Sequence, residues 1–303
     1  MARRRPLSRR ARRRRRLWPA LGALVLVGLA AGGAAFALSR TGGGGHTAAS
    51  TTTTTTPAAL PKPPKPFRIV FPEGFTRLQM GQRVKAVARI AERERHKPVR
   101  LDQKGYLAAS RHAVVPCFGR KRQTNLEGFL FPATYDFLTG TTSKRLVLTQ
   151  IQTFCAMWRS VSFAYAHSKN LTNYDILRIA SMVEAEAAVP GDRAKIAAVI
   201  YNRLRDRMPL QIDATLRYGL HIPPTRPLSP YLGSDSPYNT RKFAGLPPTP
   251  INNPGMASLE AAAHPAHVDY LYYVRKPHSV RHFFTSSGAA FDQYLATHGY
   301  GPH

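Results

Sequence analysis

Two glutamates, Glu184 and Glu186, lie among apolar residues in the segment DILRIASMVEAEAA. On a helix, Glu184 shares a line with Ala180 and Ile176, so its carboxyl would have few polar neighbours. Burial disfavours the ionised form of a carboxyl, and a group that keeps its proton near neutral pH can serve as a general acid. Glu186 lies on apolar ground as well, so the periodicity does not decide which of the two does chemistry.

A structural role is the alternative for Glu184. Arg178, Arg193 and Arg203 are near it in the sequence, and each could form an ion pair with it. A glutamate paired in this way would support the fold without taking part in a reaction. The residue types alone leave both interpretations open.

Six polar residues follow this segment and could recognise a sugar. Oriented binding of sugar hydroxyls and N-acetyl amides requires hydroxyl, amide and carboxylate groups at fixed positions. The candidates are Asn202, Gln211, Asp213, Thr215, Tyr238 and Asn239. Taken singly, each of them could instead belong to a turn.

The sequence offers no motif for a metal or a nucleotide. Only His264 and His267, in His-Pro-Ala-His, come near a zinc-ligand spacing. There is no G-x-x-x-x-G-K loop for phosphate and no G-x-S-x-G elbow for a serine nucleophile. We therefore expect neither a metal nor another cofactor.

A helix that starts near Thr172 should position the two glutamates. Thr172 is followed three residues later by Asp175, a variant of the capping box. A second helix should follow Pro190-Gly191, with Asp192 as its cap and apolar residues at helical spacing. We expect the two helices to pack as a hairpin.

The remaining elements predict an α+β domain. Residues 97–124 are mixed and very basic, and they indicate no clear element. The expected elements elsewhere are a strand from Phe67, helices at 78–96, 143–168 and Met256–Ala263, strands at 269–275 and 282–284, and a final helix.

The N-terminal segment predicts a membrane anchor. Ten arginines in MARRRPLSRRARRRRR contribute to a formal net charge of +28. Leu17–Leu38 is uncharged and mostly apolar, and a helix of this length, rising about 1.5 Å per residue, can cross a ~30 Å hydrocarbon layer. The arginines should keep residues 1–16 in the cytoplasm and place the rest outside. A cleaved signal peptide ending near Ala35-Phe36-Ala37 is the alternative.

A tether should join the anchor to the folded region. Residues 39–66 are rich in glycine, threonine and proline and have no apolar periodicity. The basic charge beyond the arginine run attracts polyanions in general, including nucleic acid, acidic lipid and wall polymers. An extracytoplasmic location argues against nucleic acid. There, Cys117 and Cys155 could form a disulfide, although two free thiols are equally compatible with the sequence.

Several sequence blocks, taken together, resemble the MltG-like (YceG-like) endolytic murein transglycosylases. The likeness covers most of residues 67–290, in the order and approximate spacing of that family. The blocks are PEGFT, LEGFLFPATY, IASMVEAEA, IAAVIYNRL, MPLQIDATLRYG, SPYNT, GLPPTPINNPG, AAHPAHVDYLYYV and HFF.

The resemblance separates the two glutamates. It implies that Glu184, the first glutamate of V-E-x-E, is the catalytic acid, and that Glu186 and the six polar residues line or support the cleft. Two positions depart from the family pattern, Ala185 between the glutamates and Arg241 after Tyr-Asn-Thr. Many members carry a LysM-like module before the catalytic region, and the short distance from Phe67 to Leu126 indicates that this module is truncated or missing.

The implied domain order follows from these observations. It comprises a cytoplasmic tail at 1–16, a transmembrane helix at 17–38, a linker at 39–66, a small subdomain at 67–125 and a catalytic domain at 126–303. The implied activity is cleavage of peptidoglycan glycan strands between N-acetylmuramic acid and N-acetylglucosamine, leaving 1,6-anhydro ends. The partners implied are glycan strands, the plasma membrane, and peptidoglycan synthases or division proteins.

Three other functions compete with this one. A hydrolase would use Asp213 or Glu186 as a second carboxylate that activates water. A non-catalytic wall-binding scaffold of the division machinery would need only the basic exterior and the tether. Nucleic-acid binding through the arginine run is the third, but membrane topology explains that run equally well.

Overall fold

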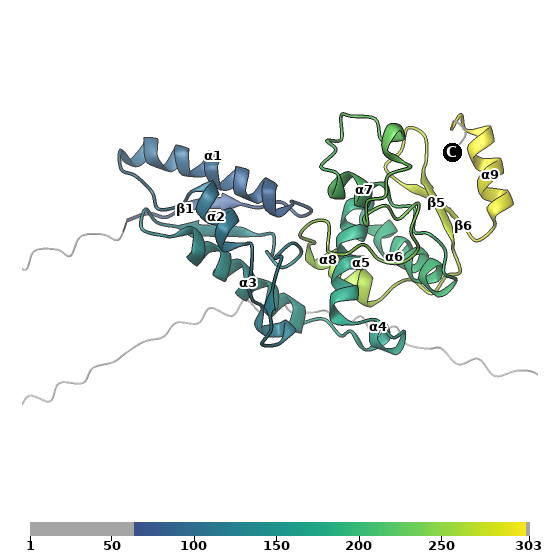
Figure 1. Cartoon of the computed structure of the whole chain (residues 1–303), viewed down its shortest axis with the longest axis horizontal. Coiled ribbons are helices and arrows are strands. Elements are labelled where there is room, and N and C mark those ends of the chain that lie inside the picture. Colours follow the sequence, from purple (N-terminus) through teal and green to yellow (C-terminus); the bar gives the residue numbers. More distant parts are fainter. Residues whose placement is uncertain (1–63, 301–303) are drawn as a thin grey trace, which may run out of the picture. The chain divides into compact units, whose positions relative to one another are not determined.

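The computed structural model describes residues 64–300 (Figure 1). Its first sheet joins two strands that are far apart in the sequence. Strand β1 (Phe67–Val70) pairs antiparallel with β4 (Thr134–Phe137), and Ile69 lies opposite Tyr135. Both of these side chains are buried. The pairing joins residues on either side of position 125, where the sequence suggested a domain boundary.

Helix α1 (Arg77–Arg95) packs against β1, helix α2 (Gln103–Ala109) packs on α1, and helix α3 (Ser143–Arg159) packs on α2. Helix α1 begins after Thr76, whose side chain forms a capping box with Gln79. The predicted helix at 78–96 is confirmed to within one residue. Tyr106 of α2 is fully buried and donates a hydrogen bond of 2.7 Å to Gln150 of α3, which satisfies both polar groups.

The basic segment in which no element was predicted contains several short ones. After α2 come the two-residue strands β2 (Ala113–Val114) and β3 (Arg122–Gln123), which pair with each other. Between them, the 3₁₀ helix η1 (Pro116–Phe118) carries Cys117, which forms a disulfide with Cys155 of α3. The pairing of the two cysteines, which the sequence left open, is therefore present.

The predicted helix at 143–168 is wrong in one respect, because it is interrupted. Helix α3 ends at Arg159 and α4 runs from Ala164 to Ser168. The Ser160 hydroxyl donates to the Met157 carbonyl at 2.7 Å and so satisfies a free group of the last turn. The break allows the Phe163 ring to stack on Trp158, with ring centroids 4.1 Å apart.

Helices α5 (Asn173–Glu186), α6 (Pro190–Arg205) and α8 (Met256–Ala263) pack together and contain the candidate glutamates (Figure 1). The capping box at Thr172, the packing of α5 on α6 and the bounds of α8 are as predicted. The predicted cap of α6 is wrong. Val189 is the capping position, and the Asp192 carboxylate instead accepts hydrogen bonds from the His282 backbone N–H and ring at 2.9 Å.

The C-terminal part adds a second layer of elements. Helix α7 (Asp213–Gly219) and the 3₁₀ helix η2 (Ser229–Tyr231) were not predicted. Strands β5 (Tyr272–Arg275) and β6 (His282–Thr285) pair antiparallel and contact α9 (Gly288–Thr297), which confirms the predicted strands and final helix.

Residues 64–300 belong to one compact unit, Pro61–His303. Helices and strands are both present, so the α+β prediction is confirmed. Among residues 64–300, no helix has the length and apolar character needed to cross a membrane. The predicted transmembrane helix at 17–38 and nearly all of the linker lie outside the described residues.

Candidate active site

Glu184 lies in the last turn of α5 with its side chain 8% exposed. Ala180 and Ile176, one and two turns earlier on the same face, are fully buried, as the helical spacing predicted. Its Oε2 atom accepts two hydrogen bonds, from the Gly255 N–H at 3.1 Å and the Ser258 hydroxyl at 2.7 Å. The carboxyl is therefore enclosed, and its orientation is fixed by specific donors.

The start of α8 supplies both donors. Gly255 is the capping residue of this helix and has no side chain that could accept from the first-turn N–H groups. The partial positive charge of a helix N-terminus attracts a carboxyl group, and Glu184 of α5 lies there. Ser258, in the first turn, is fully buried and directs its hydroxyl proton to Glu184. Packing of α5 on α8 thus creates this half of the site.

Of the three arginines considered as partners of Glu184, Arg193 is the one that lies beside it in the structure. Its Nη2 atom lies 3.9 Å from Glu184 Oε1, and its Nε donates to the Ser258 hydroxyl oxygen at 3.2 Å. The other two arginines considered in the sequence have different partners: Arg178 pairs with Asp175, and Arg203 donates to the backbone carbonyl of Leu271. Arg193, Ser258 and Glu184 therefore form a chain of polar contacts.

The two oxygens of Glu184 have different surroundings. Both hydrogen bonds go to Oε2, whereas Oε1 lies toward Arg193 and Gly74. Gly74 has a positive φ of 75°, and a Cβ there would lie 4.0 Å from Oε1. Since donors already occupy Oε2, Oε1 is the oxygen suited to exchange a proton with a bound molecule.

A second acid, Glu73, lies beside this group. Burial raises the pKa of Glu73 above its ordinary value, the negative charge of Glu184 raises it further, and the Arg193 guanidinium lowers it. No local pattern marks this residue, because it is more than a hundred positions from Glu184 in the chain. Glu73 belongs to the PEGFT block, but the family resemblance gave this glutamate no role.

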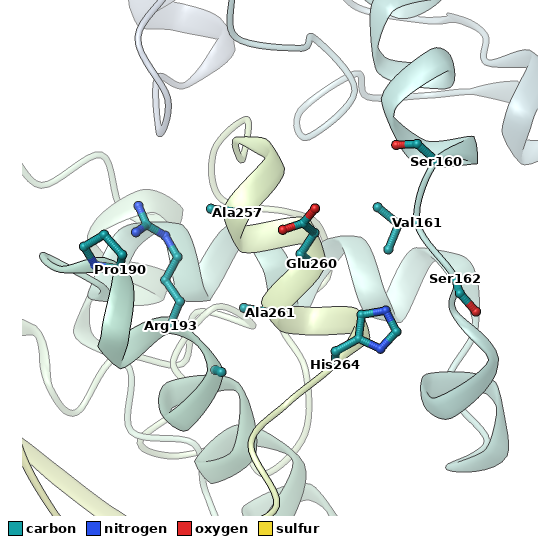
Figure 2. Close-up of a pocket in the computed structure, with 10 residues that line it drawn as sticks. Ser160, Val161, Ser162, Pro190, Arg193, Ala257, Glu260, Ala261 and His264 are labelled. Carbon is teal, nitrogen blue, oxygen red and sulfur yellow. The ribbon is translucent and has the colours of Figure 1, made fainter. Parts of the chain in front are cut away.

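A pocket of about 640 Å³ adjoins Arg193 (Figure 2). Figure 2 shows Arg193 near Pro190 on one side of α8, with Glu260 and His264 projecting from α8 on the side of Ser160 and Ser162. Arg193 lines this pocket and also contacts Glu184, and the pocket is large enough for part of a sugar chain.

Glu186 has a different set of neighbours. Burial raises the pKa of Glu186 to about 7, a hydrogen bond from the Tyr273 hydroxyl lowers it, and the charge of Asp213 raises it. Asp213 in turn accepts a hydrogen bond of 2.7 Å from Arg241. These contacts are with α7 and β5, whereas those of Glu184 are with α8 and α6. The two glutamates therefore belong to separate clusters.

Three of the six polar candidates are buried and hold backbone carbonyls. The Asn202 amide donates to the carbonyls of Val268 and Tyr270, just before β5. Thr215 donates to the Ile212 carbonyl at 2.6 Å, and Asn239 donates to the carbonyls of Leu232 and Ser234, both at 2.8 Å. All three hold backbone segments in place.

The other three candidates are less buried. Gln211 has a positive φ of 56°, and its side-chain oxygen accepts from Arg203 at 2.9 Å. Asp213 pairs with Arg241, the residue at which the sequence departs from the family pattern. The Tyr238 hydroxyl bonds to Thr249 at 2.8 Å. In residues 64–300, none of the six forms a hydrogen bond with Glu184.

A second buried carboxyl, Glu127, was missed by the sequence analysis. Its oxygens accept from the Arg77 N–H and the Asn253 amide, both at 2.8 Å, and from the Tyr218 hydroxyl at 3.1 Å. Burial raises its pKa to about 7, although these hydrogen bonds lower it. Asn253 also accepts from the Gly128 N–H, so this cluster fixes the loops before α1 and α8.

Within the described residues, no group of three histidine, cysteine, aspartate or glutamate side chains could hold a metal ion. The absence of a cofactor stays a prediction.

Comparison with known proteins identifies related chains. Residues 46–297 match the YceG-like family. The chain is 41% identical over 163 residues to an endolytic murein transglycosylase of Bacillus subtilis, covering 52% of this chain and 44% of the relative. It is 36% identical over 180 residues to one of Streptococcus pneumoniae, covering 57% and 32%. The chain thus spans less than half the length of either relative.

A solved structure has a similar fold. The crystal structure of a Listeria monocytogenes protein described as yceG-like matches with a TM-score of 0.62 and 28% identity. The match covers 75% of each chain. The likeness therefore includes most of the described elements.

Proposed function

Because this chain belongs to the YceG-like family, we propose that it is an endolytic murein transglycosylase in which Glu184 is both the acid and the base. The single observation that carries this proposal is the setting of Glu184. Its side chain is enclosed, Oε2 is held by two donors, and Oε1, which lies toward Arg193 and Gly74, accepts no hydrogen bond from the described residues. The two relatives named above, both endolytic murein transglycosylases, support the choice of substrate.

The first step is breakage of the bond between C1 of N-acetylmuramic acid and O4 of N-acetylglucosamine. Glu184 transfers its proton to O4, the bonding electrons leave with that oxygen, and a positively charged, oxocarbenium-like sugar remains at C1. The Gly255 N–H and the Ser258 hydroxyl then stabilise the carboxylate that Glu184 has become.

The second step needs no water. The C6 hydroxyl of the same sugar attacks C1, and its proton passes to the Glu184 carboxylate, which regenerates the acid and closes a 1,6-anhydro ring. A nucleophile within the substrate has a high effective concentration, so a second carboxylate that activates water is unnecessary. The candidates for that water-activating role, Asp213 and Glu186, are engaged with Arg241 and Tyr273 instead.

We further propose that the chain is anchored in the plasma membrane through residues 17–38 and acts outside the cytoplasm. The arginine run followed by an uncharged apolar stretch supports this topology. The Cys117–Cys155 disulfide supports it as well, because disulfides persist in oxidising compartments. Residues 67–125 would be the shortened subdomain before the catalytic region. Peptidoglycan synthases or division proteins are the partners proposed for the anchored enzyme.

Digestion of purified sacculi by the full-length chain tests the activity. The new ends, analysed by mass spectrometry, should all be 1,6-anhydro-muramyl ends, and Glu184→Gln should bind the glycan yet release none of them. Reducing ends, heavier by one water, would support the hydrolase instead. No new ends from a folded wild-type chain, or full activity of Glu184→Gln, would contradict the proposal.

A further inference from the structure

Glu73 is held beside Glu184 by a fixed turn after β1. Gly74, the next residue, adopts a positive φ of 75°, and its N–H donates to the Asn253 carbonyl at 3.0 Å. The Asn253 N–H in turn donates to the Phe75 carbonyl at 3.1 Å. This pair of hydrogen bonds fastens the turn to the loop that leads into α8, so the position of Glu73 is set by backbone contacts.

The Glu73 carboxyl packs directly on Gly255. A Cβ on Gly255 would overlap both Oε1 and Cδ of Glu73, so a larger residue cannot occupy this position without displacing the carboxyl. Gly255 has φ −79° and ψ 175°, which any residue can adopt, so glycine is needed here for space. The N–H of the same residue donates to Glu184. One glycine therefore contacts both carboxyl groups.

Glu73 and Glu184 both interact with Arg193, but they differ in exposure to solvent. Glu73 is exposed, whereas the Glu184 side chain is 8% exposed, so Glu73 lies on the solvent side. Partial burial and the charge of Glu184 nevertheless raise the pKa of Glu73, and Arg193 lowers it. Arg193 is also the cation nearest to Glu184 Oε1. Arg193 therefore acts on both carboxyl groups, and a negative charge on Glu73 would lie beside that of Glu184.

We propose that Glu73 is a second carboxylate of the active site, and that its charge stabilises the positively charged sugar while Glu184 moves the proton. Glu73 forms no bond and transfers no proton in this role. It acts through the attraction between opposite charges. The inference rests on the proposed transglycosylase function, because that reaction generates the positive charge.

Substitution of Glu73 in the full-length chain tests this role. Glu73→Gln keeps the shape and removes the charge, so kcat on glycan strands should fall about 100-fold, while KM changes by less than about threefold. Glu73→Asp restores the charge at a shorter reach and should recover part of the lost kcat. Glu94→Gln, which changes an exposed carboxyl of α1 away from the site, is the matched control and should retain wild-type kcat. A Glu73→Gln protein with wild-type kcat would overturn the inference.

A double substitution tests the packing of Glu73 on Gly255. Gly255→Ala should lower kcat in the wild-type chain, because the new methyl group displaces the Glu73 carboxyl. In a Glu73→Ala chain, which leaves room for the methyl group, Gly255→Ala should have little further effect. Equal effects in both chains would show that Gly255 acts independently of Glu73 and would contradict the inference. Thermal unfolding of each variant separates loss of activity from loss of folding.

The products distinguish failure of this inference from failure of the proposed function. If Glu184→Gln is inactive and Glu73→Gln is fully active, only the role of Glu73 is wrong. If the wild-type chain yields reducing ends and Glu73→Gln does not, Glu73 activates water, and both this inference and the transglycosylase proposal fail. Anhydro ends from both the wild type and the slower Glu73→Gln chain are the result expected.

Discussion

Glu184 and Glu186 are two residues apart on the same helix, yet their surroundings differ in kind. Glu184 faces the start of α8, where Gly255 and Ser258 donate to a single oxygen. Glu186 faces α7 and β5, where Tyr273 donates to it and Asp213 is a neighbouring charge. The first setting leaves one oxygen beside a pocket-lining arginine, and in the second the carboxyl interacts with Tyr273 and with the charges of Asp213, Arg275 and Arg241.

The difference shows what decides the role of a buried carboxyl. Both residues lie on apolar ground along α5, and hydrophobic periodicity could not separate them. The elements packed against each face do separate them, because those elements supply the donors and determine which oxygen is free. A catalytic carboxyl needs one oxygen that a substrate can reach, whereas a structural carboxyl is stabilised by having both occupied.

The largest effect expected from the partners of the two glutamates is at Ser258. Ser258→Ala removes a donor to Glu184 and leaves Arg193 without its acceptor on α8, so kcat should fall by about 10- to 100-fold. Tyr273→Phe removes the donor to Glu186 and should change kcat by less than about threefold. Rates on glycan strands measure both. A larger loss with Tyr273→Phe would reverse the roles assigned to the two clusters.

A smaller effect concerns stability and its dependence on pH. Burial raises the pKa of Glu186 and of Glu127 to about 7 in the folded chain, from an ordinary value of 4.5. The folded state therefore binds more protons than the unfolded chain between these values. The stability that protonation provides is fully present below about pH 4.5 and is lost as the pH rises through about 7.

Urea unfolding at about pH 5 and about pH 8 measures this dependence. The free energy of unfolding should be lower at the higher pH, by on the order of 3 kcal/mol for each carboxyl. Glu186→Gln, which cannot ionise, should remove the share due to Glu186 and leave kcat within about threefold of the wild type. An unchanged pH dependence in this variant would show that Glu186 is not a buried, protonated group.

Local signals in the sequence predicted much of the fold. The capping box at Thr172 and the bounds of α8 depend on residues within one or two helical turns, and both are confirmed. The break after Arg159 was missed because it depends on stacking of Phe163 on Trp158, a tertiary contact. Asp192 was taken for a cap because its partner, His282, lies ninety residues away.

The site was less accessible to sequence reasoning. The enclosure of Glu184 followed from helical spacing, but its donors come from the start of α8, more than seventy residues later. Glu73 and Glu127 were missed because only folding brings them to Gly255 and Asn253. Asn202, Thr215 and Asn239 could be named as polar positions, yet their backbone partners depend on loop conformations that no periodicity describes.

The most direct test of the account is the source of the oxygen at each newly formed end. Glycan strands digested by the full-length chain in water labelled with heavy oxygen should yield muramyl ends without the label, because the C6 hydroxyl of the sugar replaces water as the nucleophile. One labelled oxygen at every cut would contradict the claim that Glu184 acts without water.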